Sequence, residues 1–186
     1  MLPIALDLSR LPVAVVGRGE IMLKRLRLID EAGAVRVAVH VLDAGPALAA
    51  AAGDRLRPFL PGAADLAGVR LVVIAGLDRV EAESVARTAR EAGALINVED
   101  VVDLCDVHLP ALVRRGDLTI AVSTAGKSPA LARRLRRRLE TDYGPEWVER
   151  LAELADLRQG WREQGVPAKE VSRRSDAFLD EKEWLA

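Results

Sequence analysis

A glycine turn near the N-terminus is the first feature of the sequence that could bind a ligand. The residues Gly17-Arg18-Gly19 separate an apolar run, Val13–Val16, from a segment whose leucines recur at helical spacing. Gly17 would allow a tight turn. Gly19 would let the backbone approach a pyrophosphate resting on the free N–H groups of the following helix. The pattern predicts a dinucleotide site, with an ordinary strand–helix turn as the alternative.

Four residues stand where predicted strands end, namely Gly17, Asp43, Gly76 and Asp100. In a parallel sheet the carboxyl ends of the strands form one rim, and ligands bind beyond it. Asp43 is an acid about 20 residues after the glycine turn, where dinucleotide folds bind the ribose hydroxyls. A loop position or a helix cap before Pro46 is an equally open interpretation of Asp43.

Asp100 is the candidate general base. It follows the apolar strand predicted at Leu95–Val98, where partial desolvation would make a carboxylate a stronger proton acceptor. Glu99 and Asp103 are neighbouring acids that could serve instead. Asn97, within the strand, would orient either a ligand or a loop.

A second polar cluster precedes a predicted helix that starts at Pro129. Its members could form an anion site for a carboxylate or a phosphate, and helix capping by Ser128 alone is the alternative. They are Ser123, Thr124, Gly126, Lys127 and Ser128. The arginine run at 133–138 predicts a solvated helix face. Without interleaved aromatic residues it is a poor nucleic-acid footprint, but it could attract a small polycarboxylate.

The charge distribution, the cysteine content and the lengths of the apolar runs limit the classes of protein to which this chain could belong. The 186 residues carry a net charge of −1, but 113–138 holds eight Lys/Arg against one acid, and 139–186 holds twelve acids against seven bases. The single cysteine, Cys105, excludes a disulfide within the chain and fits a reducing compartment. The first residues lack a leader signal, and no apolar run reaches the roughly 20 residues of a membrane helix. We expect a cytoplasmic protein without a membrane or nucleic-acid partner. Two histidines and one cysteine without ligand spacing predict no metal site.

Alternating strands and helices predict an α/β fold with a Rossmann-like parallel sheet. The expected strands are 13–16, 35–42, 71–75 and 95–98, and the expected helices are 20–32, 47–52 and 79–92. A hairpin (110–115 and 118–123) and helices at 129–141 and 146–162 follow, with a further segment to 186. We expect three parts: a Rossmann-like, dinucleotide-binding domain (1–112), a hairpin and helical region whose exposed sheet edge suggests pairing with another chain (113–144), and a C-terminal helical segment (145–186).

Three stretches together resemble a known family over roughly residues 3–160. They are LPVAVVGRGE, LVVIAGLD and INVEDVVDLCDVHLPALVRRGDLTIAVSTAGKSPALARRLRRRLE. The chain is identified as similar to precorrin-2 dehydrogenases of the siroheme-synthase N-terminal type, some of which are also sirohydrochlorin ferrochelatases. The resemblance implies NAD-dependent oxidation of precorrin-2 to sirohydrochlorin, with insertion of ferrous iron as a second activity.

The resemblance also implies site residues and an assembly. Matching positions place cofactor contacts at Glu20, Ile21, Leu42 and Asp43. Asp100 matches the family's aspartate for dehydrogenation and iron insertion, and Ser128 matches a serine at the tetrapyrrole site that is phosphorylated in some members. The family forms a homodimer through the hairpin and the following helix.

The glycine turn departs from the family pattern at two positions. Where the family commonly has a third glycine and a small residue, this chain has Arg18 and Met22, whose side chains would add bulk beside the pyrophosphate. Two other functions therefore stay open. One is a sirohydrochlorin metal chelatase without dehydrogenase activity, and the other is a non-catalytic dimeric dinucleotide-sensing module.

Overall fold

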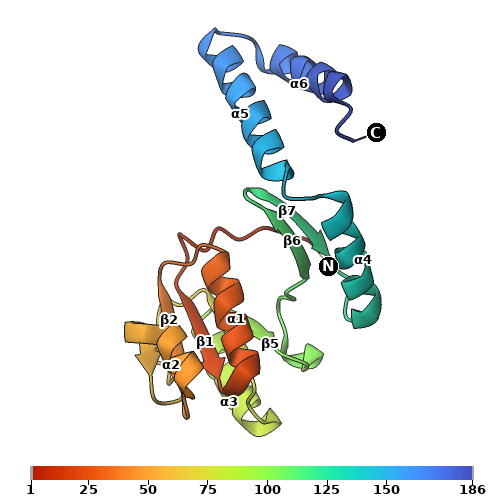
Figure 1. Ribbon diagram of the computed structural model, residues 1–186. Coiled ribbons are helices and arrows are strands. Elements are labelled where there is room, and N and C mark those ends of the chain that lie inside the picture. The colour runs from red at the N-terminus through yellow and green to blue at the C-terminus, as the bar shows by residue number, and fades with distance from the viewer. Residues whose placement is uncertain (1, 186) are drawn as a thin grey trace. The chain divides into compact units, whose positions relative to one another are not determined.

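The computed structural model describes residues 2–185, which fold into two compact units (Figure 1). Unit 1 comprises Met1–Leu109 and unit 2 comprises Pro110–Ala186. The functional division expected near residues 112 and 144 stays a prediction. None of the helices within residues 2–185 is long and apolar enough to cross a membrane.

Unit 1 is built on a five-stranded parallel sheet, which confirms the predicted fold class. Its strands lie in the order β3-β2-β1-β4-β5. Their bounds are β1 Val13–Gly17, β2 Val37–Val41, β3 Leu56–Arg57, β4 Leu71–Ala75 and β5 Leu95–Val98. The order reverses between β1 and β4, and this topological switch point is where open α/β sheets bind their ligands.

Helices cover both faces of the sheet. α1 (Gly19–Glu31) and α2 (Pro46–Ala52) pack on one face, and α3 (Arg79–Glu91) packs on the other. β1 is buried along its whole length: Val13 and Val15 belong to the first core, whereas Ala14 and Val16 belong to the second. This explains why the central strand is an uninterrupted apolar run rather than an alternating pattern.

His40 is a packed residue of β2. Its side chain is only 2% exposed, and Nδ1 lies 3.3 Å from the Phe59 carbonyl oxygen. Burial lowers the pKa of His40 below its ordinary value of 6.5, because desolvation disfavours the imidazolium form.

Unit 2 begins with the predicted hairpin. β6 (Ala111–Arg115) and β7 (Leu118–Val122) pair antiparallel across a turn in which Gly116 has a φ of +58°. The helices are α4 Pro129–Asp142, α5 Trp147–Glu163 and α6 Ala168–Lys182. Arg115 joins the hairpin to the end of α4, since Nε donates to the Tyr143 carbonyl at 2.8 Å and Nη2 donates to the Glu140 carbonyl at 3.1 Å.

Candidate functional site

The carboxyl ends of the unit 1 strands form the rim that the sequence predicted. Gly17 pairs in register with Ala75, the residue before Gly76, so the β1 and β4 turns lie side by side. Asp100 follows the end of β5 by two residues, and Asp43 follows the end of β2 by two. These residues stand on four of the five strands of one sheet.

The three rim glycines have different structural roles. A Cβ on Gly17 would lie 1.7 Å from the Ala75 carbonyl oxygen, and one on Gly76 would lie 2.3 Å from the Arg18 carbonyl oxygen. These two glycines are therefore required for the two turns to pack against each other. Gly19 (φ +73°) differs, because its hypothetical Cβ has no heavy atom within 4 Å apart from its chain neighbours and the backbone of its own helix turn. The space beside Gly19 is open for a ligand.

The N-terminus of α1 faces this opening without a cap. Arg18 occupies the N-cap position, and within the described residues its side chain makes no capping hydrogen bond. The first N–H groups of the helix, those of Gly19, Glu20 and Ile21, have no acceptors within the helix itself. In contrast, Asp78 caps α3 by accepting the Glu81 N–H at 2.9 Å. The uncapped turn and the missing Cβ fit the pyrophosphate of a dinucleotide.

The expectation that Met22 adds bulk beside the pyrophosphate is wrong. Met22 is fully buried in the core between α1 and the sheet, so it fills the helix–sheet contact instead. Arg18 does stay on the rim. Its guanidinium forms an ion pair with Glu81 of α3, across the switch point.

The end of β2 exposes an apolar residue next to an acid. Leu42 is 50% exposed, and Asp43 beside it is also exposed. The cap of α2 is Gly45, so Asp43 is a loop residue and not a helix cap. Contact of Leu42 and Asp43 with a cofactor stays a prediction.

Asp100 occupies a left-handed backbone conformation with a φ of +60°. Aspartate tolerates this region better than most residues do. The Asp100 side chain is exposed in the single chain, so the expectation that its carboxylate is partly desolvated is wrong. The reason is local: Val101 turns back to donate its N–H to the Val98 carbonyl at 3.4 Å, and this tight turn leaves Asp100 at its tip.

The three acids proposed as bases differ in their partners. Glu99 forms an ion pair with Arg25, and Asp103 accepts from Arg79 at 2.6 Å, which lowers the pKa of Asp103. Asp100 forms no ion pair within residues 2–185. In the same described range, no three His, Cys, Asp or Glu side chains are grouped so that they could hold a metal ion.

Asn97 and Cys105 hold the loop that follows β5. Asn97 is buried, and its Nδ2 donates to the Val107 carbonyl at 3.0 Å, so in this chain it orients a loop. The Cys105 Sγ accepts the Val98 N–H at 3.2 Å, and it lies 3.2 and 3.4 Å from the Val98 and Val101 carbonyl oxygens, which share its single S–H donor. Cys105 thus supports the Asp100 turn. No sequence pattern predicts this role, because a lone cysteine carries no local signal for it.

The polar turn of unit 2 satisfies many of its own hydrogen bonds. Ser128 caps α4 by accepting the Leu131 N–H at 3.2 Å, as predicted. Thr124 Oγ1 accepts the Ser128 N–H at 3.2 Å, and Ser123 Oγ accepts the Ala125 N–H at 3.2 Å. Lys127 is exposed beside them. Anion binding by this turn stays a prediction.

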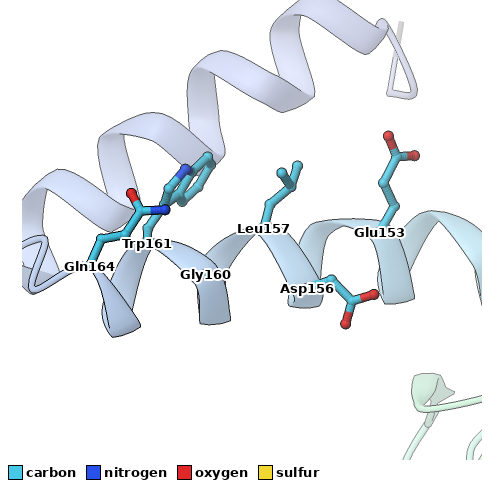
Figure 2. A pocket seen from close by; sticks show the side chains of 6 residues that line it. All are labelled: Glu153, Asp156, Leu157, Gly160, Trp161 and Gln164. Atoms are coloured by element: carbon cyan, nitrogen blue, oxygen red, sulfur yellow. The ribbon is translucent and has the colours of Figure 1, made fainter.

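A hollow of about 380 Å³ lies along α5. Figure 2 shows Glu153, Leu157 and Trp161 on one side of the helix and Asp156 on the other. Gly160 and Gln164 complete the lining. None of the predicted site residues lines this hollow, so we assign it no catalytic or binding role.

Comparisons with known proteins match both units. The family model described as "Putative NAD(P)-binding" matches residues 4–111, and the model described as "Sirohaem biosynthesis protein central" matches residues 115–141.

Among curated proteins, a siroheme synthase of Methylococcus capsulatus is 42% identical over 178 residues, covering 92% of this chain and 36% of that protein. One of Azotobacter vinelandii is 41% identical over 158 residues, covering 83% of this chain and 33% of that protein. The chain thus spans about a third of the length of these relatives. A solved structure titled "SirC, precorrin-2 dehydrogenase" has a TM-score of 0.79 and 22% identity, and the match covers 100% of this chain and 93% of that one. It shares the fold.

Proposed function

The chain belongs to the siroheme-synthase N-terminal family, and from that premise we propose that it oxidises precorrin-2 to sirohydrochlorin with NAD as hydride acceptor. The family model establishes an NAD(P)-binding domain, and the choice of NAD over NADP is part of the proposal. The proposal is supported mainly by the residues at the carboxyl ends of the unit 1 strands. An open, uncapped glycine turn and a free carboxylate lie at the ends of strands of one parallel sheet.

Strand spacing supports this placement of the dinucleotide. Neighbouring strands lie about 4.8 Å apart, so Asp43 is about one spacing from the glycine turn on one side and Asp100 about two on the other. The adenosine ribose would lie at Asp43, with the exposed Leu42 beside the base. The pyrophosphate would lie at Gly19, Glu20 and Ile21. An extended dinucleotide then brings its nicotinamide past Gly76 toward Asp100.

Asp43 is the basis for preferring NAD. A carboxylate at the end of β2 can accept hydrogen bonds from the ribose hydroxyls of NAD, and it repels the 2′-phosphate of NADP. We therefore expect a clear preference for NAD in binding.

Asp100 would act as the general base that accepts a proton from the macrocycle. Oxidation of the macrocycle removes one hydride and one proton, and NAD supplies the hydride acceptor when bound. The Asp100 carboxylate has no competing cation within the described residues, so it is available to take the proton. A substrate docked at the tip of the turn would displace water from Asp100. Asn97 would act on the substrate only through the loop that it orients. Substrate contact by Ser123, Thr124, Lys127 and Ser128 is a separate part of the proposal, in which the basic α4 attracts the carboxylate arms.

A metal chelatase is the second candidate, favoured by the same free carboxylate. Insertion of ferrous iron, as substrate, into sirohydrochlorin releases two pyrrole protons, and Asp100 can accept protons in this reaction too.

We also propose a homodimer formed through the β6–β7 hairpin and α4. Along α4 no residue is buried within the described chain, and Leu131 and Leu135 are 50% and 42% exposed. Leu135→Glu should then shift the protein to a monomer in analytical ultracentrifugation. We place the reaction in the cytoplasm, whose reducing conditions suit the free Cys105 thiol.

The deciding experiment supplies purified protein with precorrin-2 and NAD and follows sirohydrochlorin absorbance. Asp100→Asn should lower turnover about 10²–10⁴-fold while NAD affinity stays unchanged, because asparagine keeps the turn but cannot take the proton. Asp103→Asn is the matched control and should stay active. Full activity of Asp100→Asn would remove Asp100 from the mechanism. Iron insertion without dehydrogenation would favour the chelatase, and NAD binding without either turnover would favour a sensing module.

A further inference from the structure

Arg18 has a fixed backbone at the mouth of the switch point. Its N–H donates to the Ala75 carbonyl at 3.1 Å, and its own carbonyl packs so closely on Gly76 that a Cβ there would lie at 2.3 Å. The Arg18 main chain is therefore wedged between the β1 and β4 turns. Only its side chain is free to change partners.

The Arg18 side chain is held by one ion pair and is incompletely satisfied. Its guanidinium pairs with Glu81, and the Arg18 side chain is 41% exposed against 25% for Glu81. The Nε atom is buried and has no hydrogen-bond partner among the described residues. Arg18 directly precedes the open N-terminus of α1, where the pyrophosphate is proposed to rest.

Glu81 does not depend on Arg18 alone. Its carboxylate also accepts the Asp78 N–H at 3.2 Å, and it lies in the first turn of α3, where the helix dipole favours a negative charge. Glu81 would keep both interactions if Arg18 left. The ion pair can therefore open without leaving a carboxylate unsatisfied.

We propose that Arg18 is a pyrophosphate ligand. In the free protein its guanidinium pairs with Glu81, and dinucleotide binding moves the guanidinium from Glu81 to the pyrophosphate. A guanidinium binds phosphate oxygens through two parallel hydrogen bonds, and the pyrophosphate carries more charge than one carboxylate. Arg18, which interrupts the glycine-only pattern of the turn, thus contributes to binding instead of obstructing it. The inference rests on the proposed dinucleotide site and adds a residue that exchanges partners there.

Calorimetric titration of the full chain with NAD, ADP and adenosine tests the exchange. Arg18→Ala should weaken NAD and ADP about 10–100-fold and leave adenosine unchanged, since adenosine has no phosphate. Glu81→Gln should tighten NAD a few-fold, because glutamine preserves the capping hydrogen bond to Asp78 while releasing Arg18. The double variant should bind like Arg18→Ala. Glu83→Gln is the matched control: Glu83 pairs with Arg79 at 2.7 Å on the same helix and should have no effect.

Several outcomes would overturn the exchange. Tighter NAD binding by Arg18→Ala would mean that the side chain covers the site. Unchanged binding would leave Arg18 with only its ion pair. Weaker binding by Glu81→Gln would mean that the ion pair persists in the complex. Each of these results leaves the dinucleotide site intact, whereas wild-type protein that binds no NAD would refute both the site and the exchange.

Discussion

Alanine substitution should mainly lower stability at Gly17 and mainly weaken cofactor binding at Gly19. Both glycines belong to the same turn and both have positive φ, at +149° for Gly17 and +73° for Gly19. They differ in what surrounds the missing Cβ. At Gly17 it would meet the Ala75 carbonyl oxygen at 1.7 Å, whereas at Gly19 it would meet open space.

The expected free-energy changes follow from these distances. Gly17→Ala carries backbone strain of about 1–3 kcal/mol and forces β1 away from β4, which costs a further 1–3 kcal/mol or so. The total, about 2–6 kcal/mol, is a large part of the stability of a typical domain. Gly19→Ala carries only the left-handed strain, about 1–2 kcal/mol. Its new methyl group, however, would lie where the pyrophosphate has to approach.

Two measurements separate these effects. Urea unfolding must be followed by far-UV circular dichroism, because the three tryptophans are Trp147, Trp161 and Trp184, all in unit 2. Their fluorescence does not report on the sheet. Calorimetric titration with NAD then gives the affinity of each variant that stays folded.

The expected result is a strongly destabilised Gly17→Ala protein and a folded Gly19→Ala protein that binds NAD at least about 10-fold more weakly. Equal losses of stability at the two positions would contradict the distances around the two glycines. Wild-type NAD affinity in Gly19→Ala would refute the placement of the pyrophosphate.

Three further predictions concern other residues of unit 1. Cys105→Ala should lower turnover more than NAD affinity, measured as kcat against Kd, because the thiol supports the turn that carries Asp100. It should also lower the free energy of unfolding by about 1–2 kcal/mol, since the Val98 N–H loses its sulfur acceptor. For His40, the lowered pKa means that the unfolded chain binds more protons between that pKa and 6.5. The free energy of unfolding should therefore fall as pH drops through this window, and His40→Gln should remove that slope in urea titrations at several pH values. Asp43→Ser should weaken NAD about 10–100-fold and NADP less, measured by parallel calorimetry, because it removes both the ribose acceptor and the repulsion of a 2′-phosphate.

Much of unit 1 could be predicted because its signals are local. Leu71–Ala75 and Leu95–Val98 are strands with the predicted bounds, since each is a short apolar run bounded by a glycine or by acids. Gly33, which directly follows the predicted helix 20–32, has a φ of +79° and donates its N–H to the Asp30 carbonyl. In each case the residues that determine the element are neighbours in the chain.

The interactions that shape the site are not local, and no sequence pattern predicts them. Arg18 and Glu81 are 63 residues apart, and Arg25 and Glu99 are 74 apart. Charged residues are frequent in this chain, so spacing alone could not select these pairs. The exposure of Asp100 was missed for a similar reason, because a buried strand does not reveal whether the turn after it is covered.

Ion pairs engage the arginines near the rim of unit 1, whereas several arginines of α4 form none within the described residues. In unit 1, Arg18, Arg25 and Arg79 are each paired with an acid near the rim, so the free rim carboxylate of Asp100 is left as a proton acceptor. A polycarboxylate substrate needs cations from elsewhere. α4 supplies unpaired guanidinium groups, since Arg133, Arg134 and Arg137 form no ion pair within the described chain. The proposed substrate has a ring that is oxidised and carboxylate arms that bind. A free carboxylate such as Asp100 suits the ring chemistry, and the basic surface of α4 suits the arms. Under the proposed function, we expect the arginines of α4 to contribute to the affinity for the macrocycle. Neutralising the α4 arginines should therefore raise KM for precorrin-2 and leave NAD affinity unchanged.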